Sequence, residues 1–281
     1  MFTLNPFSEL TGFISPLAMQ VYVIAMVLLV IAGTVLDMIH KKSAQYFFEN
    51  SKKAQMNATR TVSVGEKASL AVKTAAVEVL TSGEFQNPRR RISHLFTMYG
   101  FILFAATTAI MIFGYADSAT PAILPILWHL GALMLCFGGY WFWFFIRVDV
   151  AAEGNPWYRV VRADLFILSL LATATFALLW SALQAANVAG WQTFFFGLFI
   201  FASTVLFGGV LWSKFAHMFF KPAAAFQKRL TKADGSAENL PVMPDLNDPA
   251  VQERFPDIPE YMGKNPPNMG LGIKRESPNH F

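Results

Sequence analysis

Cysteine and charged residues are both scarce in this chain. Asp, Glu, Lys and Arg make up 14% of its 281 residues, whereas a soluble domain has about 25%. The one thiol, Cys136, can neither close an internal disulfide nor supply the four thiolates of an ordinary iron–sulfur cluster. We interpret Cys136 as a small apolar side chain, and any iron–sulfur centre that works with this chain must belong to a partner.

The motifs of soluble enzymes are missing as well. The sequence contains no phosphate-binding loop, no zinc-binding spacing and no serine, histidine and acid spacing typical of a hydrolase. Nothing in it resembles a nucleic-acid-binding module. Because no Lys or Arg precedes the first apolar run, a cleavable signal peptide is not expected, and that run predicts a retained helix.

Long apolar runs dominate the chain instead. Apolar residues make up 54% of it, and five runs are long enough to cross a bilayer core of about 30 Å. The sequence therefore predicts an all-α integral membrane protein with five transmembrane helices. Trp212 to Lys221 are expected to continue the fifth span as a helix that leaves the membrane. The predicted spans cover residues 17–39, 95–115, 123–146, 165–183 and 193–211.

The distribution of positive charge predicts the orientation of these helices. All 22 Lys and Arg residues lie in the 41–91 loop, in the 147–162 loop or after the fifth span, and the two short links lack them. The positive-inside rule then places the N-terminus outside and the C-terminus in the cytoplasm, which suits a bacterial inner membrane. Topology and anionic lipid explain the basic surface without a nucleic acid.

On this topology the chain divides into five regions. Residues 1–16 form a lead, 17–39 the first span, 40–93 a cytoplasmic loop, 94–220 the four remaining spans, and 221–281 a proline-rich tail. Within the loop, Val64 to Leu80 predict an amphipathic helix that lies on the membrane or against a partner. The tail has too few apolar residues to build a core, so it is either disordered or wrapped along a partner.

Two histidines are expected at the cytoplasmic level on different helices. His94 begins the second span and His217 follows the fifth, and a bis-histidine haem b requires such a pair because each imidazole approaches the iron from an opposite face. Beyond His94, the helical face with Phe101, Ala105 and Thr108 could admit a flat ring. Basic side chains that could contact the propionates or a quinone are those of Arg89, Arg90, Arg91 and Lys214.

Simpler roles for these residues stay open. Histidines and basic residues at a membrane edge are commonly interfacial anchors. Asp37 inside the first span is either a proton or quinone contact or an acid that snorkels to the nearby polar boundary. His129 lies toward the outer side, where no second histidine accompanies it.

Three segments carry a family resemblance. They are His94-Leu-Phe-Thr-Met-Tyr-Gly-Phe101 with Phe104-Ala-Ala-Thr-Thr108, Arg162-Ala-Asp-Leu-Phe-Ile-Leu168, and Ser213-Lys-Phe-Ala-His217 with Lys221-Pro222. Over about residues 90 to 225 the chain resembles the five-helix membrane cytochrome b subunits related to the nitrate reductase gamma subunit. Within that group it is most similar to the membrane subunit of the quinone-interacting Qmo complex and to the membrane anchor of adenylylsulfate reductase.

The resemblance implies haem b ligands at His94 and His217, and electron transfer between quinone and a cytoplasmic iron–sulfur or flavin partner. Typical relatives have a further histidine in the fifth span, whereas Trp191 to Phe199 contain none, so a second haem is not expected. The missing cluster cysteines favour the anchor type. The hypothesis is a membrane anchor and electron-transfer subunit that links a cytoplasmic reductase of sulfur metabolism, adenylylsulfate reductase, to quinone. The alternative is a cofactor-free anchor that only recruits the soluble enzyme.

Overall fold

Five long apolar helices form the membrane part of the molecule. The computed structural model describes residues 1–41, 43–83, 85, 87–116, 118–147, 157–213, 215, 217–236 and 246–262. The helices are α1 (Pro16–Lys41), α4 (Pro88–Gly114), α5 (Ile123–Trp141), α7 (Leu165–Ala185) and α8 (Ala189–Gly208). Each is long and apolar enough to cross a bilayer, so the prediction of an all-α, five-span membrane protein is confirmed. We call the end of the bundle where α1 ends and α4 begins the basic end.

The second span begins two helical turns before its apolar stretch. The Asn87 side chain accepts hydrogen bonds from the backbone N–H groups of Arg89 and Arg90, at 2.9 and 3.5 Å, and Pro88 occupies the first turn. Such a cap, followed by proline, is a strong helix start. Because the cap lies upstream of the arginines, α4 includes them, and His94 lies inside the helix rather than at its first residue.

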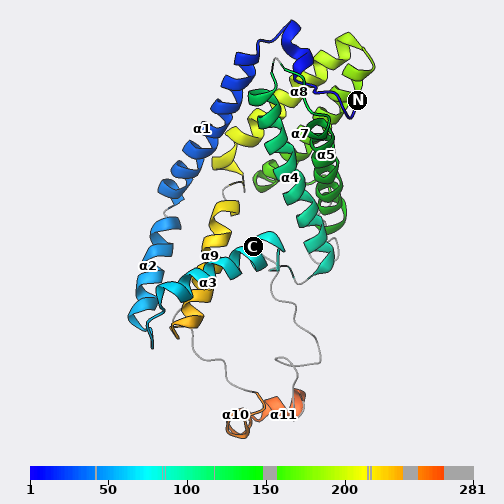
Figure 1. Cartoon of the computed structure of the whole chain (residues 1–281). Coiled ribbons are helices and arrows are strands. Elements are labelled where there is room, and N and C mark those ends of the chain that lie inside the picture. The colour runs from blue at the N-terminus through cyan, green and yellow to red at the C-terminus, as the bar shows by residue number, and fades with distance from the viewer. Residues whose placement is uncertain are drawn as a thin grey trace.

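Helices α4 and α5 pack backbone to backbone through glycine. A Cβ added at Gly100 would lie 2.7 Å from the backbone nitrogen of Leu135, and one at Gly131 would lie 2.7 Å from that of Phe104. Small residues allow this close approach of membrane helices. α7 packs against both α5 and α8, and α1 packs along α8 at the edge of the bundle, as Figure 1 shows.

The opposite end of the bundle is closed by the N-terminal lead, which includes the short helix η1 (Ser8–Gly12). Phe7 is buried between Trp128 and Trp180, with ring centroids 5.8 and 5.3 Å away. The Gln184 side chain donates to the carbonyl of Pro6 at 3.0 Å. The lead is therefore part of the core and fixes that end of the bundle.

A second layer of helices lies beyond the basic end. It contains α2 (Ser43–Met56), α3 (Val64–Thr74), the π-helix η2 (Ala75–Leu80) and α9 (His217–Ala233). α2 continues the path of α1, and α3 crosses below the bundle beside α9 (Figure 1). The predicted helix from Val64 to Leu80 is confirmed, but the sequence did not predict α2.

The expected continuous helix after the fifth span is wrong. α8 ends at Gly208, the short helix η5 (Val210–Trp212) follows, and the chain is extended at Ser213 before α9 begins at His217. The Gly208-Gly209 pair weakens the helix at this point because glycine has a low helix propensity. The proline-rich tail was expected to begin at residue 221, but Lys221 and Pro222 lie inside α9. In the rest of that tail, the structure describes α10 (Pro249–Arg254) and α11 (Asp257–Met262).

Candidate functional site

His94 is held in a defined orientation at the basic end. The preceding residue, Ser93, is buried and donates its hydroxyl hydrogen to the carbonyl of Gly138 at 2.8 Å. The Nδ1 atom of His94 shares a hydrogen bond with the hydroxyl of Ser82, 2.9 Å away. The imidazole lies 4.8 Å from the ring of Phe85, centroid to centroid. The ring is therefore positioned from both α4 and the η2–α4 connection.

That connection is fixed to α4 at three points. Ser82 is fully buried and has a positive φ of 49°, which places its side chain toward His94 at the turn. Arg91 donates from Nε to the carbonyl of Thr81 at 2.8 Å, and the Tyr99 hydroxyl donates to the carbonyl of Leu80 at 2.7 Å. His94 thus has a structural role, whatever else it binds.

Phe85 also connects His94 to α9. The ammonium nitrogen of Lys221 lies 5.2 Å from the centroid of Phe85, within the range of a cation–π contact. His217 begins α9, about one turn before Lys221. The structure therefore brings the segment that carries His217 to the same end of the bundle as His94. The His217 side chain and all of Lys214 lie outside the part of the chain that the structure describes.

His94 fits the role of a haem ligand in one respect. A histidine that ligates a metal usually engages its second ring nitrogen in a hydrogen bond, which sets the tautomer and the ring orientation. The bond from Nδ1 to Ser82 has this form, so His94 would ligate through Nε2.

The helical face expected to admit a flat ring is filled differently. Thr108 accepts a hydrogen bond from the indole nitrogen of Trp128 at 2.8 Å, and Phe101 packs near Phe207, with centroids 6.4 Å apart. Thr108 is therefore committed to the contact between α4 and α5. Phe101, Ala105 and Thr108 are all half-buried, and of the three Phe101 lies nearest the basic end.

The three arginines do not form one cluster of charge. Arg91 is directed to the carbonyl of Thr81, whereas Arg89 is exposed and Arg90 is half-buried. Arg89 therefore has the most freedom to contact an anionic group at the membrane surface.

Asp37 is packed within the chain. Its side chain is only 4% exposed. Gly33, one turn earlier on the same face of α1, lies so close to η5 that an added Cβ would be 2.8 Å from Cβ of Val210. Asp37 is therefore buried near the contact between α1 and the segment after α8, which argues against an acid that snorkels to the polar boundary.

A buried ion pair at the basic end was not predicted from the sequence. Arg147 donates from Nε to Asp164 at 2.8 Å, and its terminal nitrogen bonds the second oxygen of that carboxylate. The same guanidinium lies 4.2 Å from the ring centroid of Trp143, and the backbone N–H of Val161 donates to Asp164 at 2.9 Å. Both charged groups therefore have hydrogen-bond partners, and the pair ties the end of the third span to the start of the fourth.

His129 is a structural residue near the opposite end. It is fully buried, with Nδ1 2.7 Å from the carbonyl of Pro125 and Nε2 2.8 Å from the hydroxyl of Ser181. A carbonyl can only accept, so Nδ1 carries the proton and Nε2 accepts from Ser181. Both ring nitrogens are therefore used within the protein.

Two cavities lie at that opposite end. One is apolar and includes Phe7, Met19 and Ile112, and the other includes Glu9, Trp180 and Gln192. Neither includes His94. Among the described residues, no group of three His, Cys, Asp or Glu side chains could hold a metal ion.

Comparisons with known proteins leave the family open. No protein-family model, no curated protein and no solved structure matches this chain. The geometry of the basic end is therefore the main guide to function.

Proposed function

We propose that the chain is a membrane subunit of a bacterial redox complex, oriented with its basic end in the cytoplasm. It would anchor a soluble iron–sulfur or flavin reductase and pass electrons between that enzyme and membrane quinone. The observation that carries the proposal is the convergence of His94 and the start of α9 on Phe85. Family resemblance suggests adenylylsulfate reductase as the partner and sulfur metabolism as the pathway.

In this proposal His94 and His217 hold one haem b, which supplies one-electron chemistry when bound. Ser82 holds the His94 imidazole through Nδ1, and Nε2 is the atom that would bind the iron. Lys221 and Arg89 to Arg91 provide positive charge at the same end, and the sequence predicts that Lys214 adds to it. This charge favours bound carboxylates or a reduced quinone. Asp37 is a buried acid at this level, and it is the residue we propose to exchange protons with quinone.

A difference spectrum tests the cofactor directly. Purified protein made with ample haem should give a b-type spectrum when dithionite-reduced and oxidised samples are compared, and a pyridine haemochrome assay should give about one haem per chain. Replacement of both His94 and His217 by alanine should abolish the spectrum and quinone reduction by the complex. Unchanged quinone reduction in that double variant would rule out the proposed electron path.

The second candidate is an anchor without a cofactor. It is favoured by the folded helical layer, in which Arg229 of α9 pairs with Glu78 of η2 and Arg60 of the α2–α3 connection bonds to the carbonyl of Ala233. A flat spectrum together with retained partner binding would favour it. A truncation that removes only the tail should end after Ser236, because Asp234 and Ala233 accept hydrogen bonds from Thr59 and Arg60.

A further inference from the structure

Two apolar side chains are almost fully exposed on the helical layer. Met56 at the end of α2 is 85% exposed, and Val64 at the start of α3 is 84% exposed. They lie on either side of the connection from residue 57 to residue 63. We call this region, with the neighbouring Lys52, Lys53 and Lys67, the α2–α3 tip.

The position of the tip argues against lipid as its binding partner. α1 ends near the membrane boundary, and α2 continues its path away from the bundle (Figure 1). The 14 residues of α2 span about 21 Å at 1.5 Å per residue. Met56 is therefore well beyond the headgroups that flank a bilayer core, and lipid cannot cover it.

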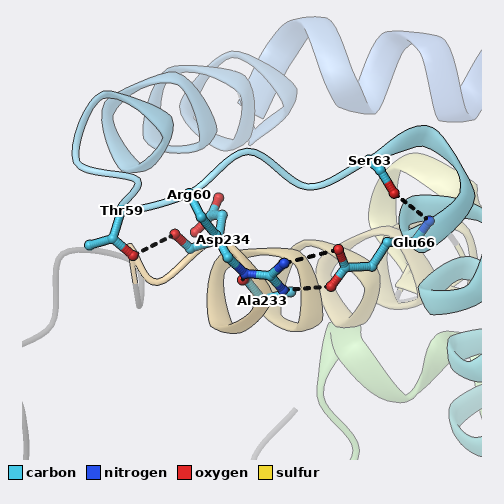
Figure 2. A network of polar contacts seen from close by, with 6 residues as sticks. All are labelled: Thr59, Arg60, Ser63, Glu66, Ala233 and Asp234. Carbon is cyan, nitrogen blue, oxygen red and sulfur yellow. Dashed lines mark hydrogen bonds and ion pairs between the residues drawn. The ribbon is translucent and has the colours of Figure 1, made fainter.

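The tip is held rigidly although it is exposed. Figure 2 shows Arg60 bridging two segments: it forms two hydrogen bonds with the carboxylate of Glu66, and its Nε donates to the carbonyl of Ala233 at 2.5 Å. The backbone N–H of Thr59 donates to the carbonyl of Asp234 at 2.9 Å, and the Ser63 hydroxyl caps α3. A surface held in one conformation loses little entropy when a partner binds.

The charge of the tip indicates what binds there. From residue 47 to residue 74 there are five Lys and Arg residues and two Glu residues. One Arg–Glu pair is already neutralised, between Arg60 and Glu66. Lys52 and Lys53 lie one helical turn before Met56, and Lys67 lies one turn after Val64. The tip therefore has an excess of positive charge beside its apolar side chains, which complements an acidic protein surface.

We propose that the α2–α3 tip is the docking point for the soluble partner, with Met56 and Val64 entering an apolar recess whose rim is acidic. The inference rests on the proposed function, because it names the surface through which the anchor holds its enzyme. Apolar anchors at the centre with complementary charge around them are typical of such interfaces.

Thiol labelling in native inside-out membrane vesicles tests the proposal. In a Cys136→Ala background, Val64→Cys should react with a maleimide polymer at least about tenfold more slowly before a high-salt wash than after it, a change that corresponds to about 1.4 kcal/mol. Returning the washed-off proteins should restore protection, and the fraction that restores it should bind an anion exchanger. The control is Ala250→Cys, an exposed position in α10, which should label equally before and after the wash.

Charge reversal gives a second measurement. Changing Lys52, Lys53 and Lys67 to Glu should abolish the protection of Val64→Cys without unfolding the layer, because all three lysines are exposed. Equal labelling before and after the wash would overturn the proposal, and so would protection in liposomes of the purified chain. Protection of Ala250→Cys alone would place docking on the tail.

The failures of the two proposals are distinguishable. If the returned fraction protects the tip but no electrons reach quinone, the electron-transfer function fails and the docking surface stands. If the protein has a haem spectrum and Val64→Cys is never protected, the docking surface fails and the cytochrome stands.

Discussion

Ser93 donates a hydrogen bond to the carbonyl of Gly138 at 2.8 Å, and this contact fixes α4 against α5 directly beside His94. The contact depends on the glycine. A Cβ at position 138 would lie 2.6 Å from the carbonyl oxygen of Ser93 and 2.8 Å from the backbone nitrogen of Thr97. Because those atoms belong to the backbone, they cannot move aside without shifting the helix.

Gly138→Ala should therefore destabilise the bundle at the basic end. Forcing atoms into a well-packed contact costs about 1–3 kcal/mol, so we expect a lower melting temperature in detergent. Gly197→Ala on α8 is the matched control, since nothing lies within 4 Å of its added Cβ. Equal melting temperatures for the two variants would contradict the close packing of α4 on α5.

The Arg147–Asp164 pair should be important for stability. Its side chains are 14% and 11% exposed, and removing one member of a buried pair costs about 3–5 kcal/mol because the other charge stays buried. We expect Asp164→Asn to lower the free energy of unfolding by an amount near the low end of that range, because both groups retain some contact with solvent. Reversible unfolding in mixed micelles measures it, with the exposed Arg162→Gln as control. A loss no larger than that of the control would show that the pair contributes little.

The sequence predicted what composition controls and missed what local geometry controls. The charge-free stretch from Leu95 to Tyr115 identified the second span, but the cap at Asn87 starts that helix earlier. Composition marks where a helix crosses the membrane core, and capping marks where it begins. The break after Gly208 was missed because the apolar stretch continues beyond it to Trp212.

The candidate site was predicted only in outline. The level of His94 and the basic residues around it followed from the order of apolar and charged runs. The residues that contact His94 and Arg147 could not be predicted in this way. Ser82 reaches His94 from a turn with positive φ, and Asp164 reaches Arg147 across a loop. Such contacts depend on backbone conformation in connections, which a hydropathy pattern does not specify. The sequence contained one signal for the ion pair. Arg147 directly follows the third span, and Asp164 directly precedes the fourth, so the two opposite charges begin and end the same loop.

The bond between Ser82 and His94 should protect the η2–α4 connection from hydrogen exchange. Ser82→Ala removes the hydroxyl and leaves a Cβ at the same positive φ, so it isolates the hydrogen bond. A net loss of about 1 kcal/mol would make residues 77–85 exchange about fivefold faster. Ser118→Ala, an exposed change at the opposite end, is the control. Unchanged exchange in Ser82→Ala would mean that Arg91 and Tyr99 hold the connection without His94.

Acid should loosen the α2–α3 tip. The hydrogen bonds from Arg60 lower the pKa of the Glu66 carboxyl below its ordinary value of 4.5. A carboxyl whose pKa is lowered by folding stabilises the folded form above its ordinary pKa, and this contribution is lost as the pH falls through the folded-state pKa. Protection of the Thr59 and Arg60 amides, which donate to the Asp234 carbonyl, should therefore fall in acid below that value.

Glu66→Gln separates this effect from general acid unfolding. The variant keeps the shape of the side chain but has no charge, so its Thr59 and Arg60 amides should be less protected at neutral pH and should lose little more in mild acid. Hydrogen exchange of the peptide from residue 57 to residue 62, corrected for the intrinsic pH dependence of exchange, measures both proteins. If the wild type and Glu66→Gln show the same protection at every pH, the ion pair does not hold the tip, and the rigidity that we assign to the docking surface must come from the backbone bonds alone.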